Sequence, residues 1–428
     1  MTCPRCKCEI PNDSKVCEVC GKIEAPYFDK KPCSITYGYG WHQFKYSPRW
    51  VCHYCADHEF ALESEEDTPE ENRNFTWEEW QKFVKEENIK LLKEAHKLGF
   101  TRIFTSLHIP EANYEVLKKE VKEFFKIAKD YNMDIISDIS PNTFKFLEID
   151  NMDLEALKNI GVKTIRIDFG YSAKEIAEMT KNPYGIKVQL NASTVTKEFF
   201  EDLDRYYPIY NQIDALHNFY PRIGTGISEE CMIEKNQLLE NRGIKASAFV
   251  QSNNRKRSPL KDGLPTLEDH RGWQAEEAAN HLIALNNKSI FIGDSLPSYE
   301  EMKSLASLDI NSIKLDIKVN TKDEVVLSLL KEKYTSRIDE ARDAIRASES
   351  RIILKNRIIE PFNTIEKSYG DITIDNRLYG RYMGELQIIK NQQKCDERTN
   401  VVGKVLDKDL YLLKYIKPGS SYHFKIIN

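Results

Sequence analysis

The sequence has no long hydrophobic run. None of its apolar stretches approaches the roughly 20 residues that span a bilayer. Its beginning, MTCPRCKCEIPNDSK, contains no apolar stretch typical of a signal peptide. A basic excess is also missing, because the formal net charge is −5 over 428 residues. We therefore expect a cytoplasmic protein that binds no membrane and does not take nucleic acid as a partner.

Cysteine is scarce outside the N-terminal segment. Eight of the ten cysteines lie in the first 55 residues, and Cys231 and Cys395 stand alone. In a reducing compartment such crowding indicates a metal site rather than disulfides. The two isolated cysteines are more typical of small buried residues than of nucleophiles.

The spacing of the N-terminal cysteines predicts a zinc ribbon. Two CxxC pairs can meet around one tetrahedral Zn²⁺, and four protein ligands make such a site structural rather than catalytic. The expected ligands of the first zinc are Cys3, Cys6, Cys17 and Cys20. A second, weaker site would use Cys33, Cys52 and Cys55 with His42, His53 or His58 as the fourth ligand. For this second set, ordinary packing is the alternative, and Cys8 is left over in either case.

Composition and periodicity divide the chain into five parts. The core content is ample, with 41% hydrophobic and 11% aromatic residues. Residues 1–58 form the cysteine-rich, zinc-ribbon-like segment, and the acidic stretch 59–75 is a linker. The remaining parts are an α/β domain at 76–317, a polar connecting helix at 318–350 and a strand-rich domain at 351–428.

Strand and helix patterns alternate through the α/β domain. Seven short β-branched runs occur between residues 102 and 295, namely TRIFTSL, DIISDIS, TIRIDFG, IKVQLNA, IDALHNF, KASAFVQ and SIFIGDS. Amphipathic helical segments separate them, which predicts a parallel sheet. A doubly wound sheet is one solution. A closed (β/α)₈ barrel of the TIM type with one further strand is favoured, because nearly every strand ends in polar residues and no glycine-rich fingerprint follows the first.

In a parallel barrel these polar strand ends meet at one mouth. The candidate residues at the strand ends are Ser106, His108, Glu111, Asp138, Asp168, Asn191, His217, Arg222 and Asp294. Acids cost stability at such positions unless they are used or paired. Asp168 lies between apolar neighbours, and it either serves the chemistry or forms a structural salt bridge with Arg166 or Arg222.

Two carboxylates that face one pocket are typical of glycosidic cleavage. One protonates the leaving oxygen, and the other acts as nucleophile, base or stabiliser of the oxocarbenium-like transition state. Asp138 and Asp168 end consecutive strands and form the predicted pair, with Glu111 in reserve. A metal-dependent hydrolase is less favoured, because His108 and His217 are far apart and no paired histidine motif exists.

A basic loop follows the strand KASAFVQ. It contains Arg255, Lys256 and Arg257, and a Pro/Gly-rich turn with Thr266 lies beyond them. Loops after the late strands of such barrels often bind phosphate through backbone N–H groups and cations. An exposed basic loop without a ligand is the alternative interpretation.

Several longer strings resemble one known family. LGFTRIFTSLHIPE, IRIDFGYS, LNAST, HNFYPR, TGISEE, GLPTLEDHR and FIGD, followed by GDITIDNRLYGRYMGELQI and NVVGKV, are similar to the 6-phospho-N-acetylmuramidases over about residues 86–428. The resemblance implies a (β/α)₈ barrel followed by a cyclophilin-like β domain. It also implies hydrolysis of N-acetylmuramic acid 6-phosphate–N-acetylglucosamine in cell-wall recycling, without an organic cofactor.

The resemblance adds expected binding residues. Asn191 and His217 lie in the matching strings, and Arg222, Arg257 and Arg381 would bind phosphate or the lactyl carboxylate. Arg381 and Glu385 lie in YGRYMGEL, which either closes over the barrel mouth or forms an amphipathic strand whose two charges pair on its surface.

The chain departs from the family pattern at its start. Family members begin with a strand and then the helix equivalent to EENIKLLKEAHKLGF, whereas the nearest strand candidate here is SITYGYG at 34–40, before the acidic linker. This departure motivates an alternative function: a barrel that binds a sugar phosphate without catalysis, with the zinc ribbon contacting a protein partner.

Overall fold

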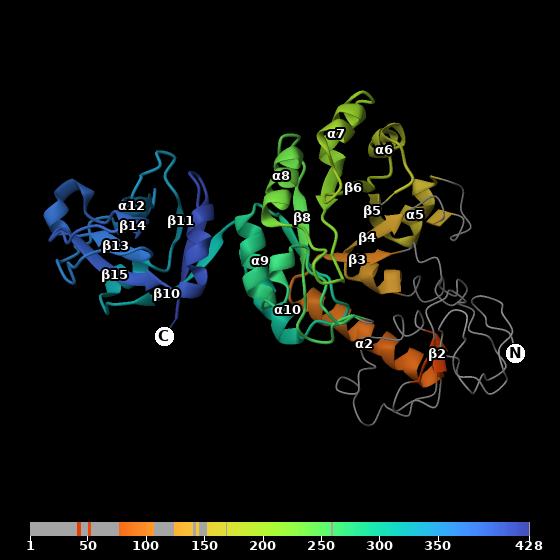
Figure 1. Cartoon of the computed structure of the whole chain (residues 1–428), viewed down its shortest axis with the longest axis horizontal. Helices are drawn as coiled ribbons and strands as arrows, with labels where there is room; N and C mark the ends of the chain where they lie inside the picture. Colours follow the sequence, from red (N-terminus) through yellow and green to blue (C-terminus); the bar gives the residue numbers. More distant parts are fainter. Residues whose placement is uncertain are drawn as a thin grey trace, which may run out of the picture. The chain divides into compact units, whose positions relative to one another are not determined.

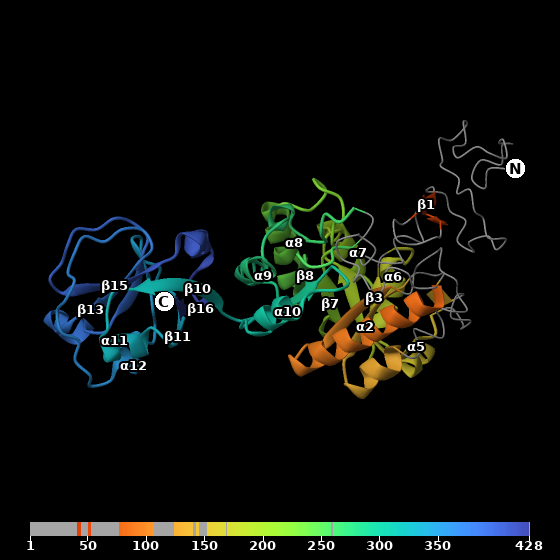
Figure 2. The ribbon, with the colours of Figure 1, turned by 90° about the horizontal axis from the view of Figure 1, so that it is seen from below.

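The computed structural model describes residues 41–43, 50–52, 77–106, 124–139, 143–144, 152–167, 169–257 and 260–427. The chain divides into two compact units. The first comprises Met1–Ala275 with Ser289–Ala306, and the second comprises Glu276–Lys288 with Ser307–Asn428. Figures 1 and 2 show both units. None of the helices in these described ranges is long and apolar enough to cross a membrane.

Seven parallel strands form the sheet of the first unit. They are β3 (Arg102–Ser106), β4 (Asp134–Ile139), β5 (Val162–Ile167), β6 (Lys187–Asn191), β7 (Ile213–Leu216), β8 (Ala246–Val250) and β9 (Ser289–Ile292). Each pairs in parallel with the next strand along the chain. The seven predicted strands are thus confirmed. The doubly wound alternative is wrong, because such a sheet reverses its strand order at a switch point.

Helices separate the strands and begin where the sequence supplies capping side chains. They are α2 (Trp77–Lys97), α5 (Leu154–Ile160), α6 (Ala173–Thr180), α7 (Lys197–Asp204), α8 (Glu229–Glu240), α9 (Ala275–Ala284) and α10 (Tyr299–Ala306). Ser172 and Glu175 form a capping box at the start of α6. Thr196 and Ser228 cap α7 and α8 by accepting a backbone N–H from the first turn of each helix.

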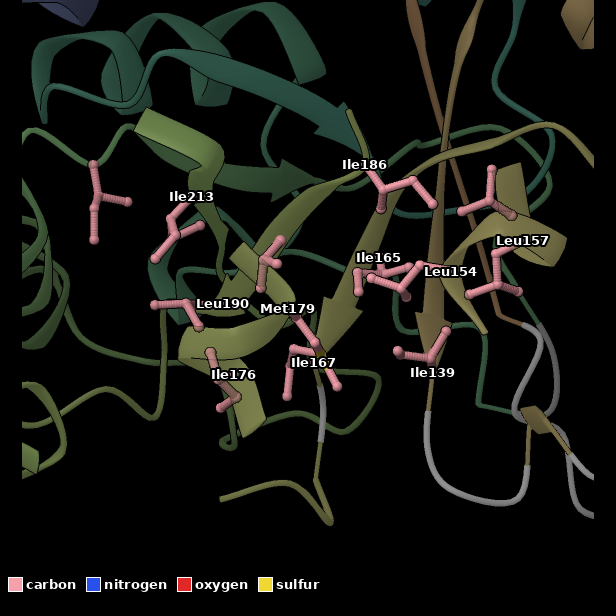
Figure 3. Packing of buried hydrophobic residues seen from close by; sticks show 14 of the residues in the cluster. Ile139, Leu154, Leu157, Ile165, Ile167, Ile176, Met179, Ile186, Leu190 and Ile213 are labelled. Atoms are coloured by element: carbon pink, nitrogen blue, oxygen red, sulfur yellow. The ribbon is translucent and has the colours of Figure 1, made fainter. Parts of the chain in front are cut away.

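Alternate residues of each strand face opposite sides of the sheet. One side packs against the helices: Ile165 and Ile167 of β5 share a buried cluster with Leu157 of α5 and with Ile176 and Met179 of α6 (Figure 3). The residues between them in the strands, such as Thr164 and Arg166, lie on the opposite side. The parallel sheet therefore has an apolar outer layer and a mixed inner layer.

Contacts in the inner layer show that the sheet is strongly curled. Arg102 of β3 donates from Nη2 to Asp214 of β7 at 2.8 Å, and from Nε to Asp134 of β4 at 3.0 Å. In a flat sheet, β3 and β7 would lie about 19 Å apart, at roughly 4.8 Å per strand. Gln189 of β6 adds a hydrogen bond to Asp214. A half-buried polar network thus connects β3, β4, β6 and β7 on the inner side of the sheet.

The strand expected to precede β3, SITYGYG at 34–40, lies outside the described residues. β1 (Trp41–Gln43) and β2 (Trp50–Cys52) form a separate antiparallel pair. The predicted zinc ligands, apart from the backbone of Cys52 in β2, also lie outside the described part.

The second unit contains its own seven-stranded sheet, in the order β11-β16-β10-β15-β13-β14-β12. The strands are β10 (Ile313–Val319), β11 (Lys333–Thr335), β12 (Ala344–Arg346), β13 (Asp371–Asp375), β14 (Leu386–Ile389), β15 (Thr399–Val405) and β16 (Ser421–Ile426). All pairs are antiparallel except β10 with β16. β10 belongs to this sheet, so the predicted domain boundary at residue 317 is too late.

The predicted connecting helix at 318–350 is wrong. This segment contains a short helix, α11 (Glu324–Leu329), and then β11 and β12, while α12 (Ser350–Leu354) begins at its end. Tyr334 and Ile345 are buried there, at 1% and 4% exposure, within the core of the second unit. Strand pairing of these apolar residues overrides the helix propensity of the Glu, Lys, Arg and Ala residues around them.

Candidate functional site

A cluster of aromatic rings fills the middle of the curled parallel sheet. Phe104 of β3 contacts Phe249 of β8 with ring centroids 5.5 Å apart, and Phe219 lies 5.1 Å from Phe249. Phe291 of β9 is 5.7 Å from the same ring. These rings form an apolar floor in which Phe249 and Phe291 are buried and Phe104 and Phe219 are half-buried. The strand ends beyond this floor form the candidate site.

An ion pair stands directly above the aromatic floor. Arg166 of β5 donates from Nη1 to Oδ1 of Asp138 at the end of β4, at 2.8 Å. Its other terminal nitrogen donates to Oδ1 of Asn218 at 2.5 Å, and its guanidinium lies 5.8 Å from the ring of Phe104. The Arg166 side chain is 4% exposed and that of Asp138 16%. Asp138 thus lies at the strand ends with a fixed cation beside it.

Several predicted site residues lie outside the described part of the chain. Asp168, Glu111 and His108 belong to this set. Ser106 ends β3, as the sequence predicted. Asp168, the second member of the predicted catalytic pair, therefore stays a prediction.

His217 is fully buried and takes a supporting place. Its Nε2 lies 3.0 Å from Oδ1 of Asn236 and its Nδ1 lies 3.1 Å from Oγ of Ser193. Burial lowers the pKa of His217 to about 4, so the ring is neutral. Because Asn236 presents an acceptor, Nε2 donates, and Nδ1 accepts from the Ser193 hydroxyl. That hydroxyl oxygen accepts the N–H of Asn218, which in turn contacts Arg166.

Two further predicted binding residues also support the strand ends. Asn191 is buried and accepts the backbone N–H of Ser193 at 3.1 Å. Thr266 is buried, donates to the carbonyl of Asn218 at 2.8 Å and accepts the N–H of Phe249 at 2.9 Å. Asn218 is therefore fixed through both its backbone and its side chain.

Asp294 follows β9 and holds the basic loop. Its Oδ2 accepts the backbone N–H groups of Ser252 at 2.9 Å and Leu264 at 3.2 Å, and its Oδ1 accepts that of Arg257 at 3.0 Å. Burial raises the pKa of Asp294, and these three hydrogen bonds oppose the rise. With Asp294 only 3% exposed, its oxygens serve the loop. The structure thus shows Asp294 as an anchor of the loop, and its predicted contact with substrate stays a prediction.

The arginines of the basic region differ in their surroundings. Arg255 pairs with Glu87 of α2 at 2.5 Å, whereas the guanidinium of Arg257 lies 6.0 Å from the ring of Phe219 in the floor. Arg222 is exposed, and its carbonyl accepts a hydrogen bond from Arg271. Arg257 is thus the cation of this loop that lies nearest the aromatic floor.

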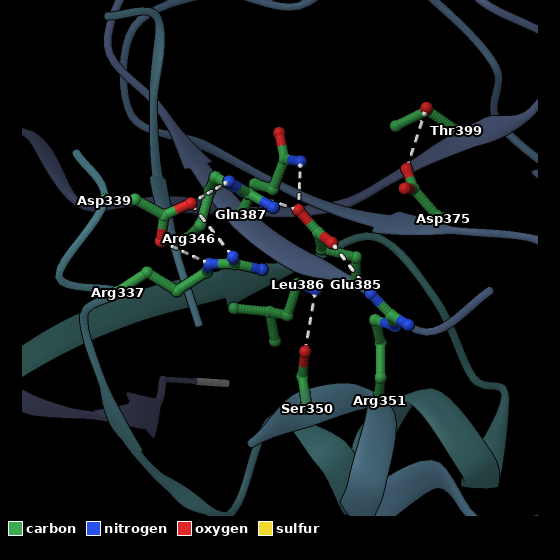
Figure 4. Close-up of polar contacts among 10 residues, drawn as sticks. All are labelled: Arg337, Asp339, Arg346, Ser350, Arg351, Asp375, Glu385, Leu386, Gln387 and Thr399. Carbon is green, nitrogen blue, oxygen red and sulfur yellow. Dashed lines mark hydrogen bonds and ion pairs between the residues drawn. The ribbon is translucent and has the colours of Figure 1, made fainter. Parts of the chain in front are cut away.

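In the second unit, YGRYMGEL is not an amphipathic strand. Arg381 lies in the 3₁₀ helix η5 (Arg377–Tyr382), which precedes β14, and donates to the hydroxyl of Tyr382 at 2.7 Å. Glu385 pairs with Arg346 at 2.7 Å and Arg351 at 3.7 Å (Figure 4). Burial raises the pKa of Glu385, but the hydrogen bond and charge of Arg346 outweigh it and hold that pKa below the ordinary value.

Within the described ranges, no group of three or more His, Cys, Asp or Glu side chains is arranged to hold a metal ion. The cysteines predicted to bind zinc are not among the side chains that the structure describes.

The comparisons with known proteins agree with the two units. Residues 80–307 match the family model described as 6-phospho-N-acetylmuramidase, N-terminal, and residues 313–425 match that described as 6-phospho-N-acetylmuramidase, C-terminal. The chain belongs to the 6-phospho-N-acetylmuramidase family. No curated protein matches this chain.

Two solved structures resemble this 6-phospho-N-acetylmuramidase family member over most of its length. An uncharacterized protein from B. cereus is 30% identical, with a TM-score of 0.66, over 80% of this chain and 96% of its own. A conserved protein of unknown function from Enterococcus faecalis is 32% identical, with a TM-score of 0.53, over 80% of this chain and 92% of its own. The first supports both the family and the shared fold.

Sequence reasoning missed some residues that the structure brings to the site. Asn218 is not among the predicted site residues, and Arg166 enters the sequence analysis only as a possible salt-bridge partner of Asp168. An arginine inside the β-branched strand TIRID was the available signal, because a buried cation there needs an acid nearby. In the second unit the missed residue is Asp375, described below.

Proposed function

We propose that this chain is a glycoside hydrolase that cleaves N-acetylmuramic acid 6-phosphate–N-acetylglucosamine in the cytoplasm, as part of cell-wall recycling. The observation that carries the proposal is Asp138, fixed by Arg166 above an apolar floor within a chain of the 6-phospho-N-acetylmuramidase family. A carboxylate held in a fixed position can stabilise developing positive charge at a sugar carbon.

The surroundings of Asp138 favour one of its two expected roles. The guanidinium 2.8 Å away stabilises the ionised carboxylate. An ionised carboxylate serves as nucleophile or as stabiliser of the oxocarbenium-like transition state, whereas a general acid must carry a proton. We therefore assign Asp138 the anionic role and keep Asp168 or Glu111 as the proton donor.

Arg257 is the proposed contact for the phosphate of the substrate. It lies at the floor, and its own backbone N–H is held by Asp294. Cations and backbone N–H groups in this late loop are the donors that phosphate requires. Arg222, on the exposed loop after β7, stays the proposed partner for the second acidic group, the lactyl carboxylate.

The finer points of the architecture are also proposals. We infer that the curled sheet closes into a (β/α)₈ barrel with a strand from outside the described residues, and that the second unit is cyclophilin-like. We further propose that the N-terminal segment binds structural zinc through Cys3, Cys6, Cys17 and Cys20. The zinc content of the purified chain, which should be at least one per molecule, checks this assignment.

The decisive test is incubation of the full chain with the phosphorylated disaccharide, followed by mass spectrometry of the products. Release of both monosaccharides is the expected result. In Asp138→Asn we expect kcat to fall by at least about 100-fold, because the anion that stabilises the transition state is lost. Asp202→Asn, the same change at an exposed site in α7, should keep full activity.

Two outcomes would contradict parts of this proposal. Full turnover by Asp138→Asn would remove that residue from the chemistry. Tight binding of the intact disaccharide with no product would instead support a barrel that binds sugar phosphate without catalysis.

A further inference from the structure

One face of the second sheet carries an array of polar side chains. Ile372 and Ile374 of β13 lie in the core, so Thr373 and Asp375 face the other side. Thr373 is paired with Gln387 of β14, and Gln387 is paired with Arg346 of β12. These side chains therefore lie in one row across three strands.

A second row runs parallel to the first. Asp375 donates its backbone N–H to the carbonyl of Glu385 at 3.1 Å, and it is paired with Thr399 of β15. The hydroxyl of Thr399 donates to Oδ1 of Asp375 at 3.1 Å. Figure 4 shows Asp375 with Thr399, and Glu385 among its cationic partners. The two rows place the carboxyl groups of Asp375 and Glu385 beside the hydroxyl of Thr373 and the amide of Gln387.

The array is buried, yet its hydrogen bonds are incomplete. Thr373 is 1% exposed, and its hydroxyl has no hydrogen-bond partner among the residues that the structure describes. Asp375 is 6% exposed and Glu385 4%. A buried hydroxyl without a partner costs about 1–3 kcal/mol. Such a group in a native fold indicates a missing partner, either a ligand or ordered water.

The charges of the array nearly cancel. Arg346 and Gln387 both donate to Oε1 of Glu385, and the positive charge of Arg346 compensates that of the carboxylate. Burial raises the pKa of Asp375 to about 7; the hydrogen bond from Thr399 opposes this rise, and the charges of Glu385 and Asp396 add to it. At neutral pH Asp375 therefore both donates and accepts. An array of this kind suits hydroxyl groups better than a phosphate.

An aromatic ring marks the solvent side of the array. Tyr382 is 38% exposed, and the guanidinium groups of Arg351 and Arg381 lie 5.3 Å and 4.9 Å from its ring. Arg351 also approaches Glu385, and the N–H of Glu385 donates to the carbonyl of Tyr382 at 3.1 Å. An exposed ring beside buried polar groups presents an apolar surface next to hydrogen-bonding groups, which matches the amphipathic character of a sugar ring.

We propose that this face of the second unit is a binding site for a neutral pyranose sugar, with Tyr382 against the ring and with Glu385, Asp375 and Thr373 bonded to its hydroxyls. The site lies wholly within the second unit, so the inference goes beyond the hydrolase proposed for the first unit and does not depend on it.

The test is titration of the full chain with N-acetylglucosamine, followed by NMR, in the wild type and in Thr373→Val. Valine matches threonine in shape and removes only the hydroxyl. We expect affinity to fall about fivefold or more, the loss of one hydrogen bond. The Tm without sugar should stay equal or rise, which a purely structural hydroxyl would not allow. Asp375→Ala, which removes both the donor and the acceptor, should also weaken binding.

Asp371→Asn is the matched control. Asp371 lies on the same strand, where it faces Lys404 at 3.8 Å, and its loss should leave affinity unchanged. Binding that is equal in the wild type, Thr373→Val and Asp375→Ala would overturn the proposal, as would an absence of binding to the wild type. Failure of the disaccharide assay with retained, Thr373-dependent sugar binding would refute only the hydrolase.

Discussion

At the scale of single residues, the tertiary surroundings decide what an ionisable side chain can do. His217 ends a strand at the candidate site, but both ring nitrogens are engaged and the ring is 0% exposed. The pKa of about 4 leaves it neutral at physiological pH. His217 therefore acts through Asn218, not as a proton carrier.

We predict that the His217 ring does not titrate between about pH 5 and pH 8, since its pKa lies well below the ordinary histidine value near 6.5. The unfolded chain takes up this proton more readily, so the stability contribution is present above about pH 6.5 and is lost as pH falls towards 4. NMR of the imidazole carbons measures the titration directly. A midpoint above pH 6 would contradict the buried, neutral assignment.

At the scale of elements, a loop can be as well fixed as a helix. Asp294 holds three backbone N–H groups of the segment between β8 and α9, and Glu301 accepts two further hydrogen bonds from Ser252 and Asn253. Gly293 permits this approach, because a Cβ there would lie 2.4 Å from the carbonyl oxygen of Leu264. The backbone that carries Arg257 is thus held in place by these hydrogen bonds.

For this loop we predict that Asp294→Asn lowers the free energy of unfolding by about 1–3 kcal/mol, because the amide nitrogen cannot accept the backbone N–H groups. KM for the phosphorylated disaccharide should rise, while Arg257→Ala combined with Asp294→Asn should be no worse than Arg257→Ala alone. Asp262→Asn removes a charge from the same loop without touching these contacts and serves as the control. Additive effects in the double variant would show that Asp294 does not act through Arg257.

At the scale of the whole molecule, the two units have separate cores and separate polar networks. The first is held from inside by Arg102, and the second contains the carboxyl pair of Asp375 and Glu385. The groups that interact with Asp375 are Glu385, Asp396, Lys367, Thr399, Tyr379 and Arg398. The stability of the second unit should therefore depend on pH in a way that this acid dominates.

The pKa of Asp375 is raised from 3.8 to about 7, so the folded state binds its proton more tightly than the unfolded state. This contribution is fully present below about pH 4 and is lost as pH rises through about 7. We predict that the free energy of unfolding of the wild type declines by an amount of the order of 2–4 kcal/mol between those limits. Asp375→Asn should remove this decline. Urea unfolding of wild type and variant at pH 4.5 and pH 8 measures it. Parallel pH dependence in both proteins would contradict the prediction.

The sequence by itself determined the elements and their order in the first unit, and it determined the family. Alternating periodicity located the seven strands, and capping residues such as Ser172 and Thr196 mark helix starts, because these signals act between near neighbours in the chain. Local signals predicted a helix wrongly at 318–350, because long-range strand pairing outweighs helix propensity there.

Only the tertiary structure decided the roles of the polar residues. Arg166 and Asp138 are 28 residues apart, and Arg102 and Asp214 are 112 apart, so their pairing depends on how the sheet curls. The same holds for Asp294, which the sequence placed among substrate contacts, and for Asp375, which it did not single out. Burial sets the pKa and the free hydrogen-bonding capacity of a side chain, and burial is a property of the folded chain.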